Sequence, residues 1–218
     1  MNDESPFHIL MIAVGLYVFH LWRQDYLAHR TGTASSNPLP GATPASVKAC
    51  VFAAVGAVII VSAETWGELH LGISEEQSTM TVVFGVYSLI AAFIEELIFR
   101  GFIVIENRGK ALRWAGVFGA SVLFAALHPF LWAWDMGETA TWRAIEIWRW
   151  NEWLTWTFTP KGWFSTAAVF VSSLWFYTVR FAIFNGTQSL IPSIVAHATK
   201  NICVFIIKGA QGFIVGWW

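Results

Sequence analysis

The stretch FIEELIFRGF, residues 93–102, places three charged side chains inside a segment that is otherwise apolar enough to cross a lipid bilayer. A charged side chain at the centre of a membrane helix costs about 2.5–3.5 kcal/mol even on the mildest insertion scale. Glu95, Glu96 and Arg100 would therefore forfeit much of the insertion free energy of their helix unless they pair or face a water-accessible cavity. Ionisable residues in such places indicate a functional site.

Helical geometry divides these three charges. Glu96 and Arg100 are four residues apart, so they lie on one face of a helix and are expected to form an ion pair. Glu95 is turned about 100° from Glu96 around the helix axis. This geometry leaves Glu95 as the carboxylate available for chemistry. The alternative interpretation is that all three form a buried network that only fixes helix packing.

The composition is that of an integral membrane protein. Of the 218 residues, 56% are hydrophobic and only 12% are charged, whereas soluble domains carry about 25% charged residues. The 14 tryptophans support this class, because indole rings collect at the membrane–water interface. The net charge of −1 gives no electrostatic reason to expect a nucleic-acid partner. Cys50 and Cys203 both fall in apolar segments, so no disulfide framework is expected.

The predicted fold class is all-α, with about six transmembrane helices in a bundle around a membrane-embedded polar cavity. A membrane-spanning helix needs about 20 mostly apolar residues. Asp3 and Glu4 stand where a signal peptide would carry Lys or Arg, so the first apolar segment is expected to be a retained helix. The six segments that qualify or nearly qualify are 7–22, 47–63, 80–105, 112–132, 163–184 and 190–207.

We divide the chain into three parts. Residues 1–79 hold the first helices and their loops, 80–205 hold the charged motif and the later helices, and 206–218 form an apolar C-terminal tail. Within the second part, residues 133–162 form a Trp-rich insertion in which tryptophan alternates with Arg and Glu. A helical wheel does not gather its apolar residues on one side. We interpret it as an irregular interfacial segment, with a lid over a membrane cavity as the sharper alternative.

The charges in the connections predict the orientation of the chain. The connections after the first and third segments are basic, whereas the connection after the second contains four glutamates and no Lys or Arg. Because short cytoplasmic loops are enriched in Lys and Arg, the N-terminus is expected outside. Arg180 in the fifth segment is expected at the cytoplasmic edge, because long basic side chains extend toward water, with contact to the substrate as the alternative.

Two further polar pairs occur in later segments. The stretch FAALH places Phe124 and His128 four residues apart, and HATKN does the same for His197 and Asn201. Each pair alone is a weak signal, since a lone membrane histidine is more often a packing residue. Together with Glu95, the pairs could supply one cavity with a carboxylate, two imidazoles and an amide.

That set of groups suits hydrolysis. A carboxylate and an imidazole can hold and deprotonate a water molecule, while a second imidazole and an amide donate hydrogen bonds to the oxyanion of a tetrahedral intermediate. The same groups are also zinc ligands. The sequence contains no HExxH pair, and spacing alone leaves zinc open.

The three motifs, in this order, resemble the CPBP family of membrane proteases, which includes the Ras-converting type of CAAX prenyl endopeptidase and bacterial relatives called Abi proteins. The family pattern is EExxxR, then FxxxH, then HxxxN, and this chain has EELIFR, FAALH and HATKN. The turn NGTQSLIPSIVAH is similar to the segment that leads into the last family motif. The likeness covers residues 80–205, with Gln188 as an insertion and Ser172 and Ser173 where relatives often have glycines.

The resemblance implies a glutamate-dependent intramembrane endopeptidase in a bacterial cytoplasmic membrane. Its partners would be the bilayer and a peptide or membrane-protein substrate, and no cofactor is expected, with zinc as the alternative. By position, Glu95 with His128 would activate water, His197 with Asn201 would stabilise the oxyanion, and Glu96 with Arg100 would support the site.

One geometric tension accompanies this assignment. Counted from the cytoplasmic helix ends, Glu95 and His197 lie about ten residues deep and His128 about fifteen, a mismatch of about 7 Å at 1.5 Å per residue. Two other functions remain open from the sequence. One is a non-catalytic membrane immunity or assembly factor of the same fold, and the other is a small proton or solute transporter, which would also use intramembrane Glu and His.

Overall fold

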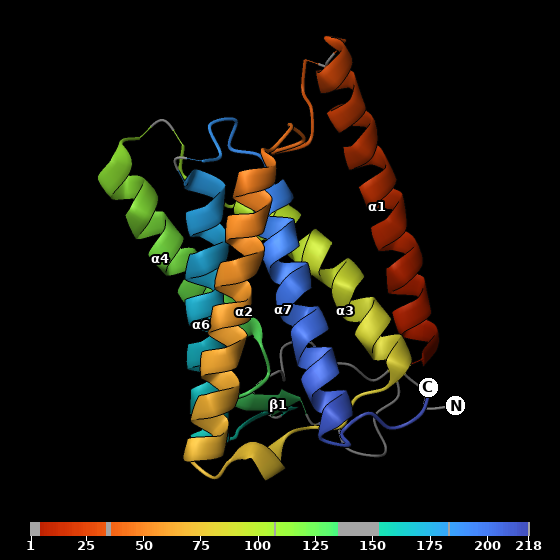
Figure 1. Ribbon diagram of the computed structural model, residues 1–218, viewed down its shortest axis with the longest axis vertical. Coiled ribbons are helices and arrows are strands. Elements are labelled where there is room, and N and C mark those ends of the chain that lie inside the picture. The colour runs from red at the N-terminus through yellow and green to blue at the C-terminus, as the bar shows by residue number, and fades with distance from the viewer. Residues whose placement is uncertain (1–4, 34–35, 107, 135–152, 183, 218) are drawn as a thin grey trace.

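The computed structural model describes residues 5–33, 36–106, 108–134, 153–182 and 184–217, and this part of the chain forms a helical bundle (Figure 1). A one-turn 3-10 helix, η1 (Ser74–Glu76), and two short strands, β1 (Trp132–Trp134) and β2 (Leu154–Trp156), complete it. The helices are α1 (Ser5–Thr31), α2 (Val47–His70), α3 (Val82–Glu95) with the π-helix η2 (Glu96–Phe102), α4 (Lys110–Leu127), α6 (Pro160–Phe181) and α7 (Ile191–Ala210).

The protein is an all-α polytopic membrane protein, as the composition predicts. Five helices in the described part are long and apolar enough to span a bilayer: α1, α2, α3 with η2, α4 and α7. Helix α6 is 22 residues long but buries several polar side chains, Ser172, Ser173 and Arg180 among them. Its inward-facing polar residues explain why it does not count among the apolar spans.

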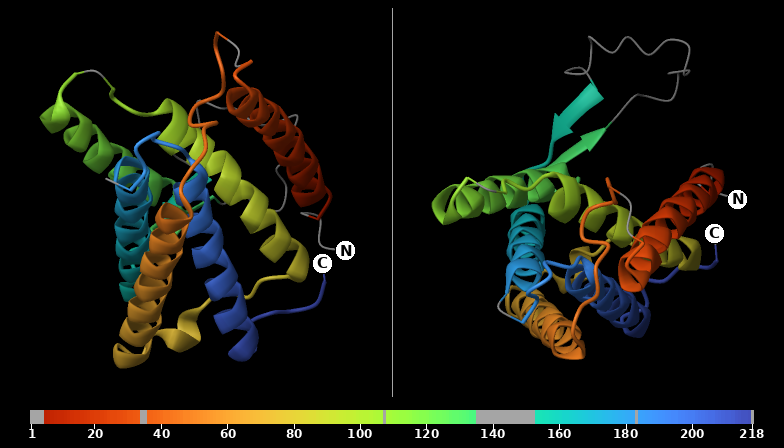
Figure 2. Two further views of the ribbon diagram at one scale, coloured as in Figure 1. Left: turned by 45° about the horizontal axis from the view of Figure 1, so that its top comes forward. Right: turned by 90° about the horizontal axis from the view of Figure 1, so that it is seen from above.

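Helix α7 lies at the centre of the packing. It contacts α2, α3 and α6 and also the η2 segment. Helix α1 packs along α3 at the rim, and α4 packs along α6 (Figures 1 and 2). The motifs of the sequence therefore meet around α7, since they are carried by α3 and η2, by the end of α4 and by α7 itself.

The first helix is longer than the hydropathy pattern predicts. It runs to Thr31 instead of Trp22, so Arg23 and Arg30 lie on the helix and not in a loop. Trp22 explains why the helix stays packed beyond its apolar stretch. Its ring contacts Phe93 on α3 at a centroid distance of 6.0 Å, and its Nε1 donates a hydrogen bond to the carbonyl of Pro40 at 3.1 Å.

The C-terminal tail anchors the start of α3. Met80 pairs with Ile214, and the amides of Val82 and Val83 donate to the carbonyls of Gly216 and Trp217 at 3.1 and 3.0 Å. First-turn amides have no partner within their own helix, so the tail satisfies two of them. The separation of 206–218 as a distinct part stays a prediction, and the observed contacts tie it to the helix that carries Glu95.

The Trp-rich insertion is regular at both of its described ends. Strands β1 and β2 pair antiparallel, with Trp132 opposite Trp156, beside α4 (Figure 2). Residues 135–152, which carry most of the insertion, lie outside the described residues. Helix α6 begins at Pro160, because Thr159 caps it by accepting a hydrogen bond from the amide of Gly162 at 3.0 Å.

The turn before α7 is held by one side chain. The amide group of Asn185 accepts from the amide of Ser189 at 3.1 Å, and its Nδ2 donates to the carbonyls of Ser189 and Arg180, each at 2.8 Å. These bonds span the inserted Gln188, whose φ of 51° lies in the left-handed region. The insertion is thus absorbed within the turn, and the start of α7 is fixed against the end of α6.

Candidate active site

Glu96 and Arg100 form the buried base of the site. Both side chains are fully buried, and Arg100 Nη1 lies 3.1 Å from Glu96 Oε1, so the predicted ion pair is present. Arg100 Nη2 also donates to Ser173 Oγ at 2.5 Å and to the Ser173 carbonyl at 3.3 Å. Ser173 in turn donates to Ser121 Oγ at 3.0 Å. Two helices beyond the motif, α6 and α4, therefore help to satisfy the arginine.

Aromatic rings enclose the Arg100 guanidinium. Its central carbon lies 4.4 Å from the centroid of Phe124, 4.7 Å from Tyr177, 5.2 Å from Phe176 and 5.8 Å from Phe99. Ring faces attract a cation, and the attraction is strongest where water is absent. The cage compensates part of the cost of burying this charge.

The charged motif lies at the junction of α3 and a π-helix. Seven residues from Glu96 to Phe102 adopt π geometry directly after Glu95. Tyr177 supports this irregular segment, since its hydroxyl donates to the Phe99 carbonyl at 2.6 Å. Short π segments are rare and occur frequently at functional sites. The sequence predicts a regular helix through this stretch, because no local pattern marks a π-helix.

His197 joins the two glutamates. Its Nδ1 lies 2.8 Å from Glu96 Oε1, and its Nε2 lies 3.8 Å from Glu95 Oε2. Its ring stacks on Phe176 at 4.6 Å. Both ring nitrogens face carboxylate oxygens. Only Nδ1 is within hydrogen-bond distance of one, and because a carboxylate accepts, Nδ1 is placed to donate to Glu96. The Glu95 side chain is 33% exposed, whereas the Glu96 side chain is fully buried, so the two neighbours face different surroundings, as their positions on a helix predict. Their separate roles stay predictions.

His128 lies beyond the end of α4 and not inside it. The helix ends at Leu127, and His128 has extended backbone angles. Its Nδ1 lies 2.8 Å from the Phe124 carbonyl, and because a carbonyl only accepts, Nδ1 must donate. This bond leaves Nε2 as an acceptor.

Phe124 connects His128 to the rest of the site. The Phe124 ring lies 4.8 Å from the His128 ring and 6.1 Å from the His197 ring. Helix α4 is tilted relative to α6 and α7 (Figure 1). Phe124 thus lies in contact distance of both histidine rings, and through it α4 brings His128 toward His197.

Asn201 lies one turn after His197 on α7. Its Nδ2 donates to the Ser88 carbonyl on α3 at 2.9 Å. An amide nitrogen carries two hydrogens, so one remains available for a ligand. The six predicted site residues thus fall into a contacting set of Glu95, Glu96, Arg100 and His197, with His128 joined through Phe124 and Asn201 held by α3.

Sequence reasoning missed the residues that hold Arg100 from the other helices, chiefly Ser173, Ser121 and Tyr177. The only signal was that Ser173 stands where a small residue was expected. We expect Ser173→Ala to lower the free energy of unfolding by about 1–3 kcal/mol, because a buried guanidinium loses its acceptor. Chemical unfolding in detergent micelles measures this, with Ser165→Ala on the same helix as control. Equal stability of the two variants would contradict it.

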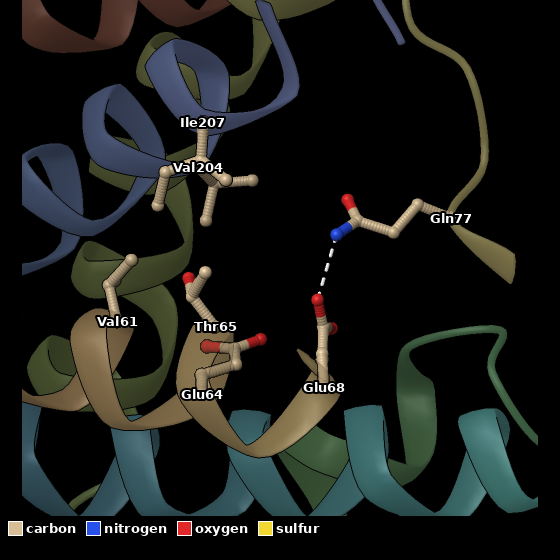
Figure 3. Close-up of a pocket in the computed structure, with 7 residues that line it drawn as sticks. All are labelled: Val61, Glu64, Thr65, Glu68, Gln77, Val204 and Ile207. Carbon is tan, nitrogen blue, oxygen red and sulfur yellow. Dashed lines mark hydrogen bonds between the residues drawn. The ribbon is translucent and has the colours of Figure 1, made fainter. Parts of the chain in front are cut away.

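A second buried ion pair borders the site. Lys200, between His197 and Asn201 in the sequence, lies with its Nζ 3.2 Å from Glu64 Oε2 on α2. Glu64 also lines a small polar pocket of about 40 Å³ between α2 and α7, drawn in Figure 3. In that pocket Glu68 accepts from Gln77 Nε2 at 2.7 Å and pairs with Lys161. The Lys200–Glu64 pair ties α7 to α2, and the Glu68 contacts tie α2 to Gln77 and to the start of α6.

We expect the Glu64–Lys200 pair to show strong coupling in a double-mutant cycle. Lys200→Met leaves a largely buried carboxylate without its cation, and we expect it to cost about 2 kcal/mol of stability, below the about 3–5 kcal/mol of a fully buried pair. The double variant Glu64→Gln/Lys200→Met should recover most of this loss. Unfolding free energies of the four proteins measure the coupling, and strictly additive values would refute it.

Arg180 lies in the last turn of α6, and its place at the cytoplasmic edge stays a prediction. Its side chain does not extend into water, since it is only 4% exposed and lies 3.6 Å from Glu106 Oε1. For metals, no group of three or more His, Cys, Asp and Glu residues placed to hold an ion occurs within the described ranges. The expectation of a cofactor-free site stays a prediction.

Comparison with known proteins agrees with this arrangement. The family model described as Type II CAAX prenyl endopeptidase Rce1-like matches residues 77–203, which is more than half of the chain and includes all three motifs. Searches of curated proteins and of solved structures found no match. The matched region begins at the turn before α3 and ends within α7, so it contains every predicted site residue. The chain belongs to the Rce1-like family of type II CAAX prenyl endopeptidases.

Proposed function

We propose that this protein is an intramembrane endopeptidase that hydrolyses a peptide bond with a water molecule activated by Glu95. Membership in the family makes a CAAX-protease-type activity the expected one. The observation that carries the finer proposal is the position of His197 between an exposed and a buried glutamate, with Nε2 3.8 Å from Glu95 and Nδ1 2.8 Å from Glu96. Glu95 and His197 together thus provide a base that water can reach and a hydrogen-bond donor whose orientation is fixed.

Glu95 and His128 act on the water. Glu95 is partly exposed, so water can reach its carboxylate. His128 donates from Nδ1 to the Phe124 carbonyl, which leaves the lone pair of Nε2 to accept a hydrogen bond from the same water. Proton transfer to a positioned base typically contributes about 10²–10⁴-fold to the rate.

His197 and Asn201 stabilise the oxyanion. His197 donates to Glu96 from Nδ1, which fixes the ring and points Nε2 toward the space beside Glu95. Donation to the oxyanion from Nε2 requires the imidazolium form, in which both ring nitrogens carry a hydrogen. Asn201 keeps one free amide hydrogen after bonding to Ser88. Fixed donors aimed at a developing negative charge are among the largest contributions to catalysis. Glu96 and Arg100 are positioning residues in this scheme, because they hold His197 and do not face the water.

The substrate is a peptide or membrane protein presented from the bilayer, and we place the enzyme in a bacterial cytoplasmic membrane with its N-terminus outside. The test compares membrane peptides from cells that contain either the wild-type protein or Glu95→Gln. We expect new C-terminal ends in the wild-type sample only. Identical peptide sets in both samples, with equal protein levels, would contradict the proposed activity.

We also propose that the reaction needs no metal. EDTA and phenanthroline are therefore expected to leave the initial rate within about twofold of the untreated enzyme, since no proposed step uses a metal-bound water. The control is a zinc protease assayed in the same detergent, which both reagents should inhibit. A loss of activity that added zinc restores would contradict the metal-free scheme.

A further inference from the structure

Two arginines gather at the end of the bundle where α4 begins and α6 ends. Arg180 on α6 and Arg113 on α4 lie on the same ring, with guanidinium carbons 5.2 and 5.1 Å from the centroid of Phe181. This end also carries residues 103–106, which follow η2, and residues 108 and 109, which precede α4 (Figure 1). The catalytic proposal uses neither arginine.

The arginine pair lacks sufficient partners among the described residues. The Nε and Nη1 atoms of Arg180 and the Nε of Arg113 are buried and have no hydrogen-bond partner there. The Arg180 side chain is only 4% exposed, and its contact with Glu106 is 3.6 Å long, beyond hydrogen-bond range. A buried charge is costly unless it is paired and hydrogen-bonded. The unused donors therefore point to an anionic ligand.

An apolar groove begins beside the arginine pair. Its volume is about 510 Å³, and it runs between residues 102–105 and the face of α4 that carries Gly116, Gly119, Ala120 and Leu123. Arg113, Gly116 and Ala120 are spaced by three and four residues, so they share this face. The side chain of Ile105 packs against Gly116, immediately before Glu106. Neither arginine lines the groove itself, but Arg113 lies one helical turn before Gly116 on α4, so the apolar groove and the arginine pair are neighbours along the same helix face.

We propose that this surface binds one anionic phospholipid, with an acyl chain in the groove and the phosphate at Arg113 and Arg180. The charge around the site matches such a headgroup, since Arg108 and Lys110 are also exposed on this side and Glu106 is the acid of the connection. A zwitterionic headgroup would bring a cation to a place already rich in cations. Basic pockets between membrane helices are suited to anionic lipid headgroups.

The site lies close enough to the catalytic residues to affect their support. Arg180 is three residues after Tyr177, which holds the η2 segment through the Phe99 carbonyl and contacts Arg100. A lipid that orders Arg180 would hold the same end of α6. The binding proposal itself does not depend on proteolysis, so its failure and the failure of the proposed enzyme are distinguishable.

The test measures lipid retention by the purified full-length protein. The protein in detergent is mixed with equal amounts of phosphatidylglycerol and phosphatidylcholine that carry the same acyl chains, and bound lipid is counted by native mass spectrometry. We expect one phosphatidylglycerol to be retained at least tenfold over phosphatidylcholine. Equal retention of the two lipids would overturn the proposal.

Three variants separate the two halves of the site. Arg180→Met and Arg113→Gln should each lower phosphatidylglycerol retention at least tenfold. Gly119→Trp should do the same while leaving both arginines, because no atom lies within 4 Å of a Cβ at this position and the indole can fill the groove. Arg30→Gln, an exposed arginine at the same end of the bundle, is the matched control and should retain the lipid.

Two further measurements examine the folding of the variants and the chemistry of the bound ligand. A tryptophan-fluorescence melt checks that each variant is folded. If Arg180→Met does not fold, Arg113→Gln and Gly119→Trp still test the headgroup site and the groove. Glycerol phosphate should not displace the lipid, since it lacks an acyl chain, and displacement would overturn the role of the groove. Stronger competition by a peptide with a free C-terminus than by its amide would assign the site to a protein carboxylate and overturn the lipid.

Discussion

Replacement of Glu95 by Gln is expected to lower kcat for peptide hydrolysis by about 10²–10⁴-fold while the protein remains folded. The amide has the same shape as the carboxylate but cannot take a proton from water. The fold should tolerate the change, because Glu95 is partly exposed and its contact with His197, at 3.8 Å, is longer than a hydrogen bond. Initial rates on a reconstituted substrate, together with a thermal melt, measure both expectations.

The neighbouring residue provides the matched control. Glu96→Gln should also lose activity, but with a clear loss of stability, since the fully buried Glu96 accepts hydrogen bonds from Arg100 and His197. We therefore expect Glu95→Gln to lower the rate without lowering stability, and Glu96→Gln to lower both. A Glu95→Gln protein that cleaves at the wild-type rate would remove Glu95 from the mechanism.

Replacement of Arg100 by Met is expected to lower the free energy of unfolding by about 3–5 kcal/mol, the largest stability effect that we predict for a single substitution. Arg100 is fully buried, so its removal leaves the Glu96 carboxylate buried without its cation. The Ser173 hydroxyl also loses its donor, and the ring cage loses its cation. Reversible unfolding in bicelles or mixed micelles measures the loss.

Two companions test the cause of this loss. In the double variant Arg100→Met/Glu96→Gln no unpaired buried charge remains, so part of the stability should return. Arg108→Gln, an exposed arginine in the segment after η2, should change stability by no more than about 0.5 kcal/mol. If Arg100→Met were as stable as Arg108→Gln, the ion pair would not be holding the helices together.

The fold class could be predicted because hydrocarbon imposes a simple rule on sequence. Long apolar runs mark α2, α3 and α7 directly. The ends of helices could not be predicted as well, since they depend on contacts with other elements. Helix α1 continues past its apolar run because Trp22 packs on Phe93, and α4 ends before His128 where the chain turns toward β1.

In the candidate site, too, local contacts could be predicted from the sequence and long-range contacts could not. The Glu96–Arg100 pair follows from a spacing of four residues, and it is present. The contact of His197 with Glu96 and the support from Ser173 join residues about 100 and 73 positions apart in the sequence, and local periodicity carries no signal for such contacts. The π-helix is likewise set by packing, because Tyr177 of α6 bonds to its Phe99 carbonyl.

The orientation of the two histidines also needed the structure. Both were placed in the site by motif, and the roles assigned to them depended on the resemblance alone. The carbonyl partner of His128 and the carboxylate partners of His197 now give a physical reason to propose an acceptor in one case and a donor in the other.

The most direct test of the central claim is a single-turnover cleavage in ¹⁸O-labelled water, followed by mass spectrometry of both the product and the protein. If Glu95 activates water directly, the label should enter the new C-terminal carboxylate of the product and the peptide that contains Glu95 should remain unlabelled. Label in the Glu95 carboxylate would indicate a covalent acyl-enzyme and contradict the proposed role. If the product and the Glu95 peptide were both unlabelled, with cleavage complete, hydrolysis by solvent water would be contradicted altogether.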